Sequence, residues 1–87
     1  MKQIIFGSDG TPESMQLAEG ERPQPGPGEI LIEVHCAGIN RPDVLQRSGR
    51  YPPPPGASPI LGLEVAGTVA ALGEGVAEWK VSDRVTA

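Results

Sequence analysis

The sequence has 87 residues and a formal net charge of −4, which indicates one small acidic domain. Its seven Lys and Arg residues give no basic surface for nucleic acid. No stretch approaches the ~20 apolar residues of a membrane span, and none forms a signal peptide. Twelve glycines and ten prolines favour short strands joined by turns, so we predict a mostly β domain. Without a membrane span or a signal peptide, we expect the protein in the cytoplasm.

Two short strands are predicted at the start of the chain. Residues 2–6 form a short apolar run, and a dense cluster of turn residues follows at 7–12. Residues 14–21 can return as the second strand. The next segment, 22–28, is so rich in proline and glycine that neither a helix nor a central strand can form there, which predicts a stiff loop.

The clearest strand covers residues 30–36. Alternation places on one face the apolar side chains that should point into the core, namely Ile30, Ile32, Val34 and Cys36. His35 falls on the opposite, polar face and is interpreted as solvated, without a catalytic or metal-binding role. Cys36 is the only cysteine, so it excludes an intrachain disulfide, and we expect a small buried side chain in a reducing compartment.

A short helix is predicted from about Arg41 to Arg47. Asn40 is the expected N-cap, Pro42 is tolerated in the first turn, and Asp43 stands where the acid of a capping box reaches back. Gly49 is placed to end the helix. The proline tract at 52–55 then predicts an extended loop, either a rigid spacer or a docking segment for another domain.

The last third of the sequence predicts one long bent strand at 60–72 and a final strand at 84–86. Gly62 and Gly67 interrupt the long strand and suggest a bulge or a close backbone approach. Leu63, Val65, Val69 and Ala71 should form its inner face, and Trp79 should cover part of the core. We expect the chain to be truncated, because it stops directly after the final strand.

The chemistry that the residues can support is limited. A dinucleotide fold needs a strand, a Gly-x-Gly-x-x-Gly turn and a helix, and the sequence contains no such combination. A polar cluster remains around the short helix: Asn40, Arg41, Asp43 and Tyr51, with Glu64 at the start of the long strand. From the residues alone, helix capping and surface packing stand beside ligand binding as interpretations of this cluster.

Five segments together resemble the start of the medium-chain dehydrogenases/reductases. They are PGPGEILIEV (25–34), AGINRPD (37–43), RSGRY (47–51) with the proline tract, GLEVAGTV (62–69) and DRV (83–85). The resemblance covers nearly the whole chain and is closest to the quinone oxidoreductase branch, especially its p53-inducible quinone oxidoreductase-like members. One departure is Ser82, where the family usually has glycine.

The resemblance implies a GroES-like partial β-barrel with one short helix, with residues 1–87 as an incomplete N-terminal catalytic domain. A Rossmann domain that binds NADPH would follow in the parent protein, which is expected to be a homodimer. Zinc-dependent members carry a cysteine ligand where this sequence has Asn40 and a histidine ligand where it has Leu63, so a zinc-free reductase is implied.

By the same resemblance, Asn40, Arg41, Pro42, Asp43 and Val44 would face the nicotinamide end of NADPH. Asn40, Asp43 and Tyr51 would line the pocket for a quinone or enone substrate and serve as its catalytic residues. The expected function is therefore that of an NADPH-dependent quinone oxidoreductase, with the chain inactive by itself. Two alternatives are a stand-alone GroES-like module that binds a partner protein and a zinc-free alcohol or enoyl reductase.

Overall fold

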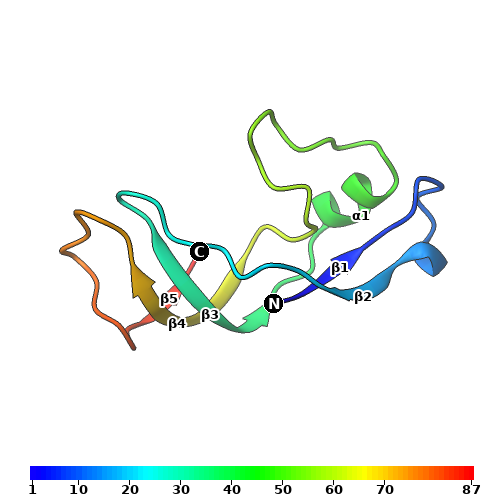
Figure 1. The fold of residues 1–87 in the computed structure, drawn as a ribbon. Helices are drawn as coiled ribbons and strands as arrows, with labels where there is room; N and C mark the ends of the chain where they lie inside the picture. Colours follow the sequence, from blue (N-terminus) through cyan, green and yellow to red (C-terminus); the bar gives the residue numbers. More distant parts are fainter. The chain divides into compact units, whose positions relative to one another are not determined.

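Five strands, one short α-helix and one 3-10 turn make up the chain, and the computed structural model describes all 87 residues (Figure 1). The content is mostly β with a single short helix, as the sequence predicted. The chain divides into two units. Residues 1–21 and 39–63 form the hairpin and helix unit, and residues 22–38 and 64–87 form the sheet unit.

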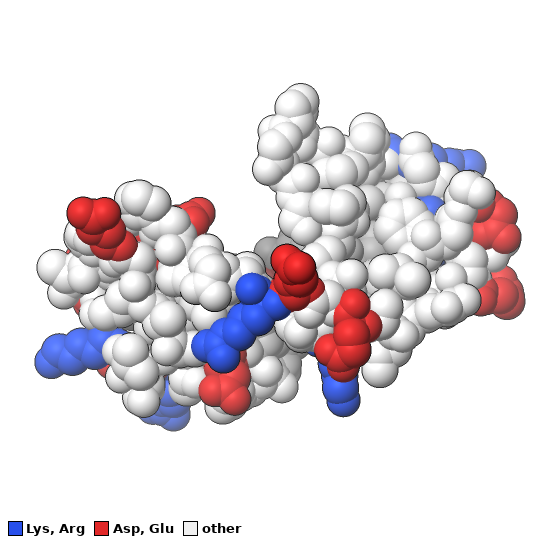
Figure 2. Space-filling view, viewed as in Figure 1, with Lys and Arg blue, Asp and Glu red and all other residues white.

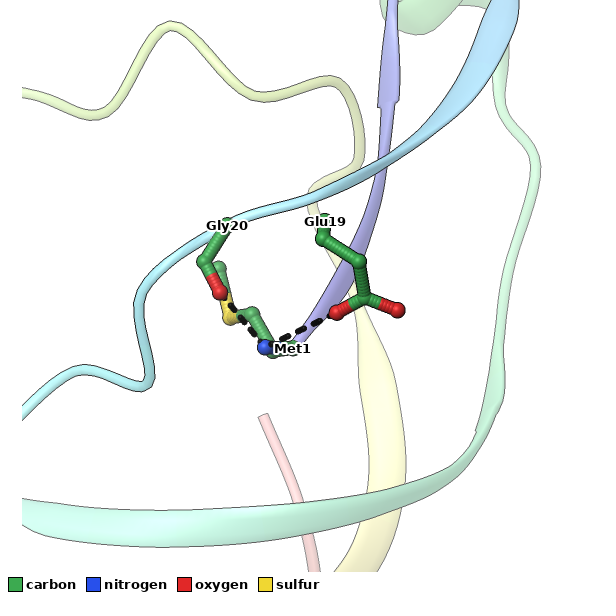
Figure 3. Close-up of polar contacts among 3 residues, drawn as sticks. All are labelled: Met1, Glu19 and Gly20. Atoms are coloured by element: carbon green, nitrogen blue, oxygen red, sulfur yellow. Dashed lines mark hydrogen bonds and ion pairs between the residues drawn. The ribbon is translucent and has the colours of Figure 1, made fainter.

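The hairpin and helix unit begins with two antiparallel strands, β1 (Lys2–Ile5) and β2 (Gln16–Glu19). Their register places Ile4 opposite Leu17. The N-terminal amine of Met1 donates a hydrogen bond of 2.6 Å to the Gly20 carbonyl and lies 3.6 Å from the Glu19 carboxylate (Figure 3). The second strand is shorter than predicted, because a 3-10 turn, Pro12–Ser14, takes up its expected beginning.

Helix α1 (Arg41–Arg47) has the predicted bounds. It ends in a Schellman motif, in which the Arg50 N–H donates to the Leu45 carbonyl (2.8 Å) and the Gly49 N–H to the Gln46 carbonyl (3.1 Å). Gly49 has a φ of +82°, so glycine is needed here, as predicted. Two side chains fix the helix within its unit: Gln46 Nε2 donates to the Pro59 carbonyl, and Arg47 Nε donates to the Gly10 carbonyl.

The sheet unit contains three antiparallel strands in the order β3 (Ile30–Ala37), β4 (Val65–Leu72) and β5 (Arg84–Thr86). Val69 on the central strand is 2% exposed and is the one fully buried large side chain. It lies opposite Ile32. A core this small follows from the length of the chain, since small domains bury a low fraction of their surface.

The pairing of β3 with β4 contains two β-bulges, and the inner face of β3 differs from the predicted one. The register passes from the pair Val34 and Gly67 to the pair Cys36 and Ala66, so His35 has no partner on β4. One extra residue on a strand moves the following side chain to the other face. Cys36 is exposed rather than buried, as are all the residues from Glu33 to Ala37 at this end of the strand, and Val34, which faces a glycine, is 50% exposed. The second bulge, between Leu31 and Ile32, leaves Ala70 of β4 unpaired.

The predicted long strand at 60–72 is wrong in its first part, since β4 begins only at Val65. Gly62 has a φ of +115°, which is incompatible with a regular strand, and Leu63 is 55% exposed instead of inward-facing. Gly67 behaves as predicted. A Cβ atom at this position would overlap the Glu33 carbonyl oxygen, so glycine permits the close approach of β3 and β4.

A β-turn at residues 80–83 leads into β5. The Asp83 N–H donates to the Lys80 carbonyl at 3.0 Å, and Ser82 has a φ of +80°. Because Ser82 is the only non-glycine residue with a positive φ, Val81 has a negative one and the turn is of type II. No helix in the chain has the length and apolar character needed to cross a membrane.

Candidate functional site

Asn40 stands at the start of α1 with extended backbone angles (φ −132°, ψ 165°), as expected for an N-cap residue. Its backbone N–H donates a hydrogen bond of 2.9 Å to Oδ2 of Asp43, the third helical residue, which is the carboxylate half of a capping box. The Asn40 side chain faces the Asp43 backbone N–H as the other half of the capping box, and it is exposed. Its amide NH₂ group remains open to a ligand.

The Asp43 carboxylate is oriented toward the protein rather than toward solvent. Oδ2 accepts the hydrogen bond from the Asn40 N–H, while Oδ1 is buried and has no hydrogen-bond partner in the chain. A buried acceptor without a partner is unusual in a folded protein and carries a free-energy cost. The structure thus brings Asp43 together with Asn40 and makes the carboxylate a support for the N-cap.

The other first-turn residues present a mixed surface. Arg41 is exposed and lies within 4.0 Å of no carboxylate, Pro42 is partly buried, and Val44 is 37% exposed. Proline at the second helical position lacks only an N–H that has no partner inside the helix. The exposed part of this turn offers a peptide surface, an apolar patch and one side-chain amide.

Tyr51 follows α1 in the bend that leads to the proline tract and is 45% exposed. No hydrogen bond joins its hydroxyl to Asn40 or Asp43. The structure therefore groups Asn40 with Asp43 and leaves Tyr51 as a separate exposed side chain of the same unit.

Residues suited to hold a metal do not cluster. No group of three or more His, Cys, Asp or Glu side chains has a geometry that could hold a metal ion. Leu63 is apolar and 55% exposed. Among the carboxylates, the pKa of Asp9 is lowered, and the main cause is the hydrogen bond from the Thr11 backbone N–H.

Sequence reasoning missed a second candidate site, on the sheet unit. A depression of about 670 Å³ is open to solvent beside the β4 and β5 ladder. Its polar and aromatic lining comes from His35, Thr68, Trp79, Asp83, Arg84 and Thr86. Simple alternation along β3 could not predict the place of His35, because His35 is the extra residue of the bulge.

Charged side chains are mixed on the surface seen in Figure 2. On the face shown in Figure 2, acidic and basic side chains are interspersed among uncharged ones. This distribution agrees with the excess of 11 acidic over seven basic residues and gives no support for a nucleic-acid interface.

Residues 26–87 match the family profile of the alcohol dehydrogenase GroES-like domain. The sequence is also 46% identical over 83 residues to a mycocerosic acid synthase-like polyketide synthase of Mycobacterium tuberculosis (strain ATCC 25618 / H37Rv). That match covers 95% of the chain but only 4% of the much longer synthase.

Two solved structures resemble the chain over almost its entire length. Escherichia coli quinone oxidoreductase in complex with NADPH superimposes with a TM-score of 0.86 at 42% identity, covering 99% of this chain and 26% of the enzyme. The CurK enoyl reductase superimposes with a TM-score of 0.84 at 29% identity, covering 98% and 28%. The chain therefore spans about a quarter of the length of the structures that it matches.

Proposed function

The chain belongs to the alcohol dehydrogenase GroES-like domain family, and from this premise we propose that it is the N-terminal domain of an NADPH-dependent quinone oxidoreductase. The observation that carries the proposal is the 42% identity, over 99% of the chain, to E. coli quinone oxidoreductase in complex with NADPH. In this proposal a separate Rossmann domain binds the cofactor, the parent protein is a dimer, and the 87-residue chain has no activity alone.

The start of α1 fits the nicotinamide end of NADPH better than its phosphates. The Asn40 amide is exposed and can pair with a carboxamide, which presents one donor group and one acceptor. The Asp43 carboxylate close to the helix start would repel a phosphate, and the Asp43 N–H already donates to the Asn40 carbonyl. The proposed contacts of Asn40, Arg41, Pro42 and Val44 are therefore with an uncharged ring.

The proposed chemistry rests on positioning. NADPH, when bound, would supply the hydride for reduction of a quinone. Asn40 and Tyr51 line the quinone pocket and donate hydrogen bonds to its carbonyl oxygens, and Tyr51 or solvent supplies the proton. Asp43 acts through Asn40, since its Oδ2 holds the backbone N–H of that residue and its Oδ1 is buried.

We also propose that the reaction uses no metal. Asn40 and Leu63 take the places of two zinc ligands of the zinc-dependent relatives, and neither side chain is a plausible ligand for zinc. A quinone is electrophilic enough to accept a hydride when only hydrogen bonds polarise its carbonyl groups.

Steady-state kinetics of the parent protein with NADPH and a simple quinone test these roles. Asn40→Ala and Tyr51→Phe should each lower kcat/KM for the quinone about tenfold, which corresponds to the loss of one hydrogen bond of about 1.4 kcal/mol. Asp43→Asn, which can still accept from the Asn40 N–H, should have a smaller effect than Asp43→Ala.

The matched control is Glu13→Gln, an exposed change in the 3-10 turn of the same unit, which should leave kcat and KM unchanged. Unchanged kcat/KM in both Asn40→Ala and Tyr51→Phe would show that neither residue contacts the quinone.

Reduction of an enoyl group is a second candidate function. The likeness to the CurK enoyl reductase and the 46% identity to a polyketide synthase favour it. Both reactions pass a hydride to a carbon conjugated with a carbonyl group, so the same residues would serve. Comparing kcat/KM for a quinone and for an enoyl thioester in the parent protein separates the two functions. The kcat/KM of the preferred substrate should be more than tenfold higher than that of the other.

A further inference from the structure

The depression on the sheet unit is built by the β4 and β5 ladder. The register places Thr68 opposite Arg84 and Ala66 opposite Thr86, and residues opposite each other in an antiparallel pair lie on the same face. The bulge in β3 adds His35 to the lining. Hydrogen-bonding side chains from three strands thus converge on one open hollow of about 670 Å³.

Arg84 carries a charge without a counter-ion. No carboxylate lies within 4.0 Å of its guanidinium group. The nearest acid in the sequence, Asp83, uses its Oδ2 to accept the Lys80 N–H at 2.9 Å in the turn before β5. A guanidinium group binds a carboxylate through two parallel hydrogen bonds, so Arg84 is suited to anchor one.

The rest of the lining suits a flat molecule. Trp79 is the only tryptophan and is 44% exposed at the hollow, where its ring offers an aromatic surface. The side chains of His35, Thr68 and Thr86 form no hydrogen bond within the chain, so they can donate to or accept from a ligand. The one carboxylate in the lining, Asp83, has its Oδ2 engaged by the Lys80 N–H, so Arg84, the Trp79 ring and these polar groups are the features that suit a small planar anion.

We propose that this depression binds a small aromatic carboxylate, with Arg84 pairing with the carboxylate and Trp79 contacting the ring. The proposal is independent of the oxidoreductase function, because every lining residue belongs to the sheet unit and none is among the residues assigned to the quinone or to NADPH.

Titration with sodium benzoate at constant ionic strength tests the site. Trp79 is the single tryptophan, so its fluorescence and its indole N–H resonance report from inside the hollow. Both signals should change and saturate with benzoate. Benzamide, which lacks the charge, and cyclohexanecarboxylate, which lacks the flat ring, should each bind at least about fivefold more weakly.

Arg84→Gln should weaken benzoate binding at least about fivefold. Arg84→Lys keeps the charge but loses the paired donors of the guanidinium group, so its affinity for benzoate should lie between those of Arg84→Gln and the unchanged chain. If Arg84→Gln fails to fold, weaker binding by Arg84→Lys than by the unchanged chain is the result that the proposal requires. Arg50→Gln, at an exposed arginine of the other unit, is the matched control and should bind as the unchanged chain does. Signals that never saturate, equal binding of benzamide, or full affinity in Arg84→Gln would overturn the proposal.

Discussion

Ser82 is the one non-glycine residue with a backbone in the left-handed region, with a φ of +80° at the third position of a type II turn. This conformation costs an L-residue about 1–2 kcal/mol, and the third position of a type II turn favours glycine for that reason. The turn nonetheless forms, because the Ser82 N–H and the Asp83 carbonyl both bond to Val69 of β4.

We expect Ser82→Gly to stabilise the chain. The free energy gained by relieving the strained φ should exceed the entropic cost of ordering a glycine on folding. The net gain in the free energy of unfolding should be about 0.5–1 kcal/mol. The midpoint of urea denaturation should rise accordingly, with no change in its slope. A lower midpoint in the Ser82→Gly chain would show that the serine side chain stabilises the turn in another way.

Asp9 provides a pH-dependent contribution to stability. Its carboxylate accepts hydrogen bonds from the Thr11 N–H, the largest cause, and from the Thr11 hydroxyl, and these lower its pKa below the ordinary value of 3.8. Because the unfolded chain binds this proton more readily, the contribution is present above pH 3.8 and is lost as the pH falls through the lowered pKa.

An NMR titration that follows the Asp9 carboxyl carbon and the Thr11 amide should give one common pKa below 3.8. In the Asp9→Asn chain the acid-range shift of the Thr11 amide should disappear. A pKa of Asp9 at or above the ordinary value would contradict the hydrogen-bonded turn.

At the scale of elements, the helix and the face of β4 that carries Val69 were predictable, and the inner face of β3 was not. The signals for α1 are local: a cap at Asn40, an acid three positions later and a glycine after the last turn fix both ends. The direction in which the side chains of β3 point depends on how the strand pairs, because the bulge at His35 is a feature of its register with β4. Alternation within one strand holds no information about which surfaces cover that strand, and residues 33–37 are all exposed, so the predictions for Val34 and Cys36 were wrong.

Gly67→Ala should disrupt the pairing of β3 and β4. The added Cβ would overlap the Glu33 carbonyl oxygen, and backbone atoms on both strands must move to admit it. We expect a loss of about 1–3 kcal/mol or more in the free energy of unfolding. Chemical denaturation measures this loss.

Gly26→Ala is the matched control in the same unit. There the added atom meets only the end of the Glu29 side chain, which can rotate away, so the loss should stay below about 1 kcal/mol. Equal stability of the two variants would show that β3 and β4 can separate more easily than the structure implies.

At the scale of the whole chain, little apolar surface is buried. Val69 is fully buried, whereas Leu17, Ile39, Leu63 and Val81 are each more than half exposed. The sequence predicted the β-rich class from its many glycines and prolines, and the family from its ordered motifs. The chain covers 26% of the E. coli quinone oxidoreductase that it matches, and which of its polar residues contact a ligand was not predictable from these 87 residues alone.

The most direct test of the proposed function is NADPH oxidation with a simple ortho- or para-quinone, measured on the parent protein and on the 87-residue chain side by side. The proposal predicts turnover by the parent protein, with or without a metal chelator, and none by the chain. Absence of quinone-dependent oxidation in the parent protein, or loss of its activity with the chelator, would contradict a metal-free quinone oxidoreductase.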